Sequence, residues 1–220
     1  MTYTDLQEES IQTIFYTIIT AFLYNFSNDI KGTLEEMVRM TLRVYDNVLH
    51  GPLKPTPNKS HYTFNLRDIS RIFQGLVNAN NKLTTQPVHL VRMWIHENQR
   101  VFGDRLIDNI DRDWLTHLLN NESEKTFNLN HKQIYNTQRL IFGDYMGSID
   151  SENRIYQQLE DLKHFVTKIE DYLEDYNGSQ KNQMKLVMFL DACDHVSRIE
   201  RVLRQPLGHS LLLGVGGSGR

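Results

Sequence analysis

Apolar residues recur every three or four positions through the first half of the chain, which is the spacing of one face of an α-helix. The first such run extends from Ile11 to Phe26, and the second extends from Ile30 to Leu49 before a Gly-Pro pair. The proline-rich stretch that follows, GPLKPTPNKS, cannot be helical throughout. The pattern therefore predicts two amphipathic helices and a stiff connector.

Three more helices are expected, starting near Asn65, starting after Pro87, and as a short segment around residues 114–119. No alternation typical of strands interrupts this region. Residues 1–122 are thus predicted to form a compact helical bundle. The polar stretch NNESEKTFNLNHKQ, at residues 120–133, marks the expected boundary, and residues 123–220 are taken as a second unit.

The second unit has a different pattern. The apolar segment RLIFGDYM, at 139–146, predicts an extended stretch, and apolar residues from Ile155 to Tyr176 predict a long helix. That helix could form a coiled coil or pack within its own fold, and the short run favours internal packing. DYNGSQKNQ, at 175–183, predicts a turn. A helix is expected over Met184–Arg204, and a strand is expected over Leu211–Leu213.

Composition narrows the function. The formal net charge of −3 gives no basic field that would favour nucleic acid, and no apolar stretch is long enough to span a bilayer. The single Cys193 excludes a disulfide framework and a multi-cysteine metal site. The acidic residues between Asp104 and Asp113 lack the glycine and final glutamate of a calcium loop. We therefore expect no metal site and no catalytic residue.

Two segments could bind an anion, and the first is FNLRDISR. Asn65 can cap a helix, Asp68 can complete a capping box, and Arg67 then lies in the first turn. An arginine beside a helix N-terminus is unfavourable on its own but suits a bound phosphate. The alternative is a solvated surface arginine.

The second segment is GVGGSGR at the end of the sequence. An apolar run precedes it, as a strand precedes the phosphate-binding G-x-x-x-x-G-K-[ST] loop, although Arg220 stands where lysine belongs. A flexible glycine-rich tail is the alternative. The candidate phosphate-binding residues of this partial Walker A loop are Gly214, Gly216, Gly217, Ser218, Gly219 and Arg220.

Three segments carry a family resemblance: SHYTFNLRDISRIFQGL, LVRMWIHENQRVFGDRLIDNIDRDWL and MKLVMFLDACDHVSRIERVLRQPLGHSLLLGVGGSGR. They closely resemble dynein heavy chains, from the helical lid of the third AAA+ module into the start of the fourth. The resemblance covers essentially the whole chain. The arginine form of the glycine loop is more similar to axonemal than to cytoplasmic dyneins.

The resemblance implies a mainly α fold. Residues 1–122 would be the small helical lid bundle of the third module. Residues 123–220 would supply the opening helices and first core strand of an incomplete AAA+ α/β P-loop domain, cut within its Walker A loop. Arg67 would be the second sensor, which contacts the terminal phosphate of the third module's nucleotide.

The resemblance also implies a function for the intact protein, an ATP-driven motor that moves toward microtubule minus ends in the axoneme of a cilium or flagellum. Its cofactors would be ATP or ADP with Mg²⁺. Its partners would be neighbouring AAA+ modules, microtubules, and intermediate and light chains, with no nucleic acid and no membrane. The isolated chain lacks most parts of a phosphoryl-transfer site, so we expect neither nucleotide binding nor hydrolysis. The alternative is a standalone helical scaffold or adaptor.

Overall fold

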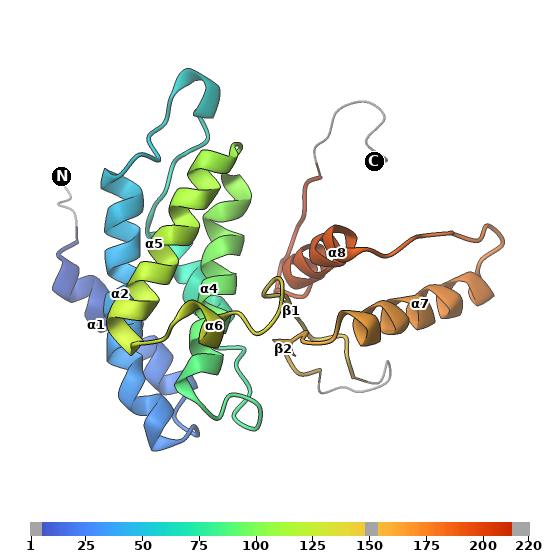
Figure 1. The fold of residues 1–220 in the computed structure, drawn as a ribbon, viewed down its shortest axis with the longest axis horizontal. Coiled ribbons are helices and arrows are strands. Elements are labelled where there is room, and N and C mark those ends of the chain that lie inside the picture. Colours follow the sequence, from blue (N-terminus) through green and yellow to red (C-terminus); the bar gives the residue numbers. More distant parts are fainter. Residues whose placement is uncertain (1–5, 148–153, 213–220) are drawn as a thin grey trace. The chain divides into compact units, whose positions relative to one another are not determined.

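The computed structural model describes residues 6–147 and 154–212 (Figure 1). The chain divides into two compact units, residues 1–140 and residues 141–220. Each unit is described by itself.

The regular elements among the described residues of the first unit are all helices, joined by loops, as the sequence predicts. Helices α2, α4 and α5 lie side by side in it (Figure 1), and α3 packs on α4 while α1 packs on α2. Its elements, with η for short 3-10 helices, are α1 (Glu8–Phe22), α2 (Asn28–His50), η1 (Pro57–Lys59), α3 (Leu66–Leu76), α4 (Pro87–Val101), η2 (Gly103–Arg105), α5 (Asn109–Phe127) and α6 (His131–Ile134).

The core of the first unit is built around large side chains that water does not reach. Trp94, Phe73 and Phe102 are completely or almost completely buried, and the ring of Phe15 stacks on Phe73. The indole N–H of Trp94 donates to Thr41 Oγ1 at 2.8 Å. Burial of aromatic area supplies the main driving force, and this hydrogen bond removes the cost of a buried donor.

Helix α1 buries only half of its apolar face. Phe15 and Ile19 are buried, but Ile14, Ile18 and Phe22 point to solvent, with Phe22 62% exposed. The apolar stripe of α1 is therefore wider than the surface that α2 and α3 cover.

Helix α5 is longer than the short helix that the sequence predicts. It continues through the first half of the polar stretch to Asn128, which ends it in the left-handed conformation with φ 53°. Glu122 stabilises this last part because it pairs with Arg43 of α2 at 2.8 Å. Glu122 is nearly buried against this half-exposed arginine of the neighbouring helix, so its polarity did not mark a helix end.

Contacts of residues 128–140 extend the first unit past the boundary expected near residue 122. Arg92 donates to the carbonyl oxygens of Gln133 at 2.7 Å and Ile134 at 2.8 Å. A ring nitrogen of buried His96 lies 2.9 Å from the carbonyl oxygen of Leu140. These bonds attach the connecting segment to α4, and the compact unit ends at Leu140.

The second unit is smaller and mixed. The extended stretch predicted near Ile141 is present as β1, which pairs antiparallel with β2, Phe142 opposite Gln158. Buried Ile141, Tyr145, Leu159, Phe165 and Cys193 form its apolar cluster. Its elements are β1 (Phe142–Gly143), β2 (Gln157–Gln158), α7 (Leu162–Ser179) and α8 (Leu190–Leu203).

The predicted helix from Ile155 was wrong in its first part. Residues 157–158 form β2, and Leu159 N–H donates to the carbonyl oxygen of Ile141 at 2.8 Å. The helix begins at Leu162, where Asp161 caps it by accepting from Lys163 N–H at 2.9 Å. Its apolar face packs on the cluster of the second unit, which agrees with internal packing of that face.

Two further boundaries were wrong. The predicted turn at 175–183 starts later, because α7 continues through Asn177 and Gly178 to Ser179. The predicted helix over Met184–Arg204 begins only at Leu190. The Asn177 side chain accepts from the N–H of Met184 at 2.7 Å and donates to its carbonyl oxygen at 2.8 Å, which closes the loop between the end of α7 and the non-helical segment that contains Met184.

The predicted strand over Leu211–Leu213 is not formed in its described part. Leu211 and Leu212 are exposed and belong to no strand. A core strand needs hydrogen-bonded neighbours, and the sheet in the described part of the chain contains only β1 and β2. Leu213 and the glycine-rich loop lie outside the described residues.

Candidate functional site

The first turn of α3 forms as the sequence predicts. The N–H of Asn65 donates to Asp68 Oδ2 at 3.0 Å, and Asn65 Oδ1 accepts from the N–H of Arg67 at 2.9 Å. This reciprocal capping satisfies donors that would otherwise lack partners at a helix start. The capping box fixes α3 to begin at Leu66.

Arg67 lies in this first turn with an exposed side chain, as predicted. Among the described residues its guanidinium makes no ion pair or hydrogen bond, so it is available to an external anion. The neighbouring helix N-terminus carries a partial positive charge that favours the same kind of ligand. The role of Arg67 as a second sensor stays a prediction.

Arg105 of η2 holds the capping residue Asp68 from the opposite side. Its two terminal nitrogens bind the two carboxylate oxygens of Asp68, and Nη1 also donates to the carbonyl oxygen of Thr63 at 3.1 Å. The Asp68 side chain is only 2% exposed. A buried carboxylate requires such a charged, bidentate partner, because an unpaired buried charge is costly.

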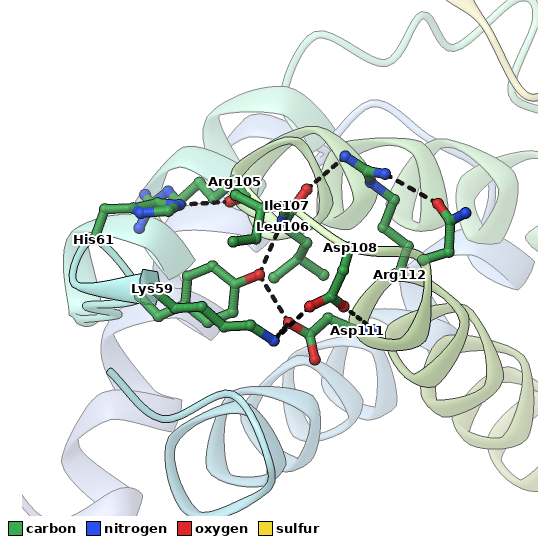
Figure 2. Close-up of polar contacts among 10 residues, drawn as sticks. Lys59, His61, Arg105, Leu106, Ile107, Asp108, Asp111 and Arg112 are labelled. Carbon is green, nitrogen blue, oxygen red and sulfur yellow. Dashed lines mark hydrogen bonds and ion pairs between the residues drawn. The ribbon is translucent and has the colours of Figure 1, made fainter. Parts of the chain in front are cut away.

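A second polar cluster fastens the connector before α3 to the start of α5. Figure 2 shows the Lys59 ammonium directed at two carboxylates, with distances of 2.7 Å to Asp108 and 2.5 Å to Asp111. The hydroxyl of buried Tyr62 donates to Asp111 Oδ2 at 2.8 Å and accepts from the N–H of Ile107 at 2.9 Å. These contacts connect residues 59–62 with residues 107–111.

The electrostatics of this cluster follow from its geometry. Hydrogen bonds from Lys59 and from the N–H of Asp111 hold the pKa of Asp108 below its ordinary value. The two carboxylates in turn raise the pKa of Lys59. Burial is the main cause of the raised pKa of Tyr62. Both shifts keep Lys59 and Asp108 in their ordinary ionised states, as in a structural ion pair rather than an acid–base catalyst.

The acidic residues between Asp104 and Asp113 have different structural roles, and Asp111 among them is buried and paired with Lys59. Asp108 caps α5 by accepting from the N–H of Asp111 at 3.0 Å. The described residues contain no group of three or more histidine, cysteine or carboxylate side chains that could bind a metal ion. Among them, no helix is long and apolar enough to cross a membrane.

The second unit contains a partly buried ionic cluster that sequence reasoning missed. Arg204 binds Asp144 through Nε at 2.8 Å and Nη2 at 2.5 Å, and its Nε lies 3.3 Å from Glu200 Oε1. Burial, together with a hydrogen bond to Asp144, raises the pKa of Glu200 to about 7. Sixty residues of sequence separate Asp144 from Arg204. No local pattern marks such a pair.

The predicted sites are thus unequally described. Arg67 lies on α3 as expected, whereas Gly214, Gly216, Gly217, Ser218, Gly219 and Arg220 lie outside the described residues. Sequence reasoning missed Arg105, which contacts Asp68 from 37 residues away. The capping pattern at Asn65 and Asp68 marks the start of the helix but does not indicate which distant residue binds Asp68.

Two protein families match the chain. Residues 37–137 match the AAA+ lid domain, and residues 184–220 match the P-loop containing dynein motor region D4. The helical bundle and the first of these matches define the first unit as the lid domain of an AAA+ protein.

Several curated proteins are similar over most of the chain. Dynein axonemal heavy chain 1 of Mus musculus is 43% identical over 192 residues, which cover 87% of this chain and 4% of that protein. Dynein axonemal heavy chain 6 of Homo sapiens is 38% identical over 215 residues, which cover 97% of this chain and 5% of that protein. Dynein axonemal heavy chain 2 of Mus musculus is 40% identical over 215 residues, with the same coverages.

The chain belongs to the dynein heavy chain family, which confirms the resemblance seen in its sequence. It spans 4–5% of the length of these three relatives, in the part that leads from a lid domain into motor region D4.

Proposed function

We propose that the chain is part of an ATP-driven motor that moves toward microtubule minus ends. Within that motor, residues 1–122 would be the lid of the third AAA+ module, and residues 123–220 would open the fourth. The order of a lid domain followed by motor region D4 supports this assignment. A standalone scaffold would not account for that order.

Arg67 would contact the terminal phosphate of nucleotide bound by the third module. The observation that carries this proposal is an exposed guanidinium in the first turn of a capped helix. Because its own helix end repels a cation, this position is favourable only when an anion completes it. A charge-assisted hydrogen bond to phosphate contributes about 1.5–3 kcal/mol.

The segment Gly214–Arg220 would form the start of the fourth module's Walker A loop. In the intact motor the cofactors would be ATP or ADP with Mg²⁺. In a phosphate-binding loop the backbone N–H groups surround the phosphates, and a cation at the lysine position adds charge, which Arg220 can supply. The 220-residue chain alone would not bind or hydrolyse ATP, because magnesium ligands and a water-positioning residue are also required.

The setting would be the axoneme of a cilium or flagellum, since the similar curated proteins are axonemal heavy chains. The partners of the lid would be the neighbouring AAA+ modules. Microtubules and the intermediate and light chains would bind other parts of the heavy chain.

The test substitutes Arg67→Ala in a heavy-chain motor that contains this segment, followed by titration of ATP and ADP. Because the contact is to the terminal phosphate, ATP affinity at the third module should fall about tenfold or more while ADP affinity changes less. Arg67→Lys should recover part of the loss. Lys31→Ala removes an exposed cation near the start of α2 and serves as the matched control. Equal loss for ATP and ADP, or none, would reject the sensor role.

A further inference from the structure

The first turn of α3 follows a connector with little regular structure. Residues 51–64 lead from α2 toward α3 and contain only one turn of 3-10 helix, η1. Buried Tyr62 and the Lys59 ion pairs anchor this connector, and α3 packs on α4, so these contacts position the helix as a whole. The contacts at its first turn add to them and decide how that turn is held.

Arg105 makes these contacts on both sides of the helix start. It binds the carbonyl oxygen of Thr63, two residues before the cap, and the carboxylate of Asp68, three residues after it. A planar guanidinium can bind a carboxylate with two nitrogens and a carbonyl with the same fork, which the single ammonium of lysine cannot do.

Arg105 is itself held in place. Its carbonyl oxygen lies 2.8 Å from Nε2 of His61, and its guanidinium lies 5.5 Å from the ring centre of Phe64. That ring meets Phe102 edge-on at 5.6 Å. Figure 2 shows His61 and Arg105 facing each other beside the Lys59 cluster.

A continuous chain of bonds links Arg105 to Arg67. Asp68 accepts from Arg105 and also from the N–H of Asn65, and Asn65 Oδ1 accepts from the N–H of Arg67. We infer that Arg105 is a positioning residue. By binding Asp68 and Thr63 it fixes the first turn of α3, and this turn sets the direction in which the Arg67 side chain points. This inference rests on the proposed anion-binding role of Arg67.

The primary test measures amide hydrogen exchange in the 220-residue chain by NMR. Arg105→Gln should accelerate exchange at Arg67, Asp68 and Ile69 at least tenfold and leave the core of α4 around Trp94 unchanged. Arg105→Lys should give a smaller local increase. Uniform acceleration through α3 and α4, or no change at α3, would overturn the inference.

Arg112→Gln is the matched control. Like Arg105, Arg112 binds a backbone carbonyl oxygen, that of Leu106 at 2.6 Å, but it lies at the start of α5. Among the described residues it makes no hydrogen bond or ion pair with α3. Its loss should leave exchange at residues 67–69 unchanged. Acceleration there equal to that of Arg105→Gln would show a general effect of this segment and would reject a specific role for Arg105.

A second variant covers the case in which Arg105→Gln does not fold, since it leaves Asp68 buried without its main partner. The double variant Arg105→Gln with Asp68→Asn removes that charge. It should restore the overall fold and still show rapid exchange at residues 67–69. Normal protection there in the folded double variant would count against positioning.

An assay in the heavy-chain motor separates this inference from the proposed function. Arg105→Gln should lower the affinity for ATP, as Arg67→Ala does. The double variant should bind ATP no more weakly than Arg67→Ala alone. If Arg67→Ala leaves nucleotide binding unchanged, the sensor role fails while the exchange result still decides positioning. If Arg67→Ala weakens ATP but Arg105→Gln does not, positioning fails and the sensor role stands.

Discussion

The two units are stabilised in different ways. The first buries several large aromatic side chains in one helical core, and its ion pairs include the nearly inaccessible carboxylates of Asp68 and Glu97. The second has a small apolar cluster and exposes other apolar residues, with Val187 83% and Leu207 91% exposed. The ion pairs around Arg204 in this unit are only partly buried, with the Arg204 side chain 44% exposed.

This difference predicts different stabilities. Buried apolar area contributes roughly 25 cal/mol per Å² to stability. In an ion pair, by contrast, the attraction between the charges is largely offset by the cost of removing them from water. The first unit should therefore be the more stable part, and the second should respond more to pH. The following predictions test this contrast, from the largest expected effect to the smallest.

Trp94→Ala should have the largest effect. It opens a cavity in the core of the first unit and leaves Thr41 without the indole donor, so the free energy of unfolding should fall by about 3–5 kcal/mol. Trp114 remains in the same unit, and its fluorescence during urea unfolding measures the loss. Phe165→Ala in the second unit should cost less, because its partly exposed neighbours can relax. An equal or larger cost for Phe165→Ala would contradict the contrast.

The stability of the second unit should fall as pH rises from 5 to 8. The pKa of Glu200 is about 7 in the folded unit, above its ordinary value of 4.5, so the folded state binds the extra proton in this range. Stability is therefore highest with Glu200 protonated and is lost as pH rises through 7, by about 1–2 kcal/mol after allowance for partial exposure. Hydrogen exchange in α8 at several pH values measures it.

Glu200→Gln is the control for this pH dependence, since it removes the titrating group and keeps a similar shape. The profile of α8 should then be flat between pH 5 and 8, while the first unit is unaffected in both proteins. A slope that persists in Glu200→Gln would assign the effect to another group.

Removal of the helix caps should have a moderate effect that is similar in both units. Asn65→Ala in the first unit and Asp161→Ala in the second each leave first-turn donors without a partner. Each should cost about 0.5–2 kcal/mol, measured by hydrogen exchange in α3 and α7. A negligible cost at Asp161 alone would mean that α7 is frayed at its start.

Arg67→Ala should have the smallest effect. Its exposed side chain makes no hydrogen bond or ion pair with a described residue, so the free energy of unfolding should change by no more than about 0.5 kcal/mol. Urea unfolding followed by tryptophan fluorescence measures it. A decrease of more than about 1 kcal/mol in the free energy of unfolding would assign Arg67 a structural role and count against the proposal that it binds a nucleotide phosphate.

Local rules account for much of the first unit. The spacing of apolar residues predicted α1 and α2, and Asn65 with Asp68 predicted the start of α3, because these signals act within a few residues. The same rules were less successful in the second unit. There Leu159 bonds to the carbonyl oxygen of Ile141 instead of joining a helix, and the Asn177 side chain binds the backbone of Met184, so these contacts overrode the local helix pattern.

The sequence by itself determined the helical class of the first unit, the cap that starts α3, the position of Arg67 and the family to which the chain belongs. Only the tertiary structure decided which residues hold that helix start in place. Arg105 reaches Asp68 across 37 positions, and Arg204 reaches Asp144 across 60. Neither pair has a sequence signal. The partner of a charged side chain is the residue that helix packing places next to it, and nearby sequence does not determine that packing.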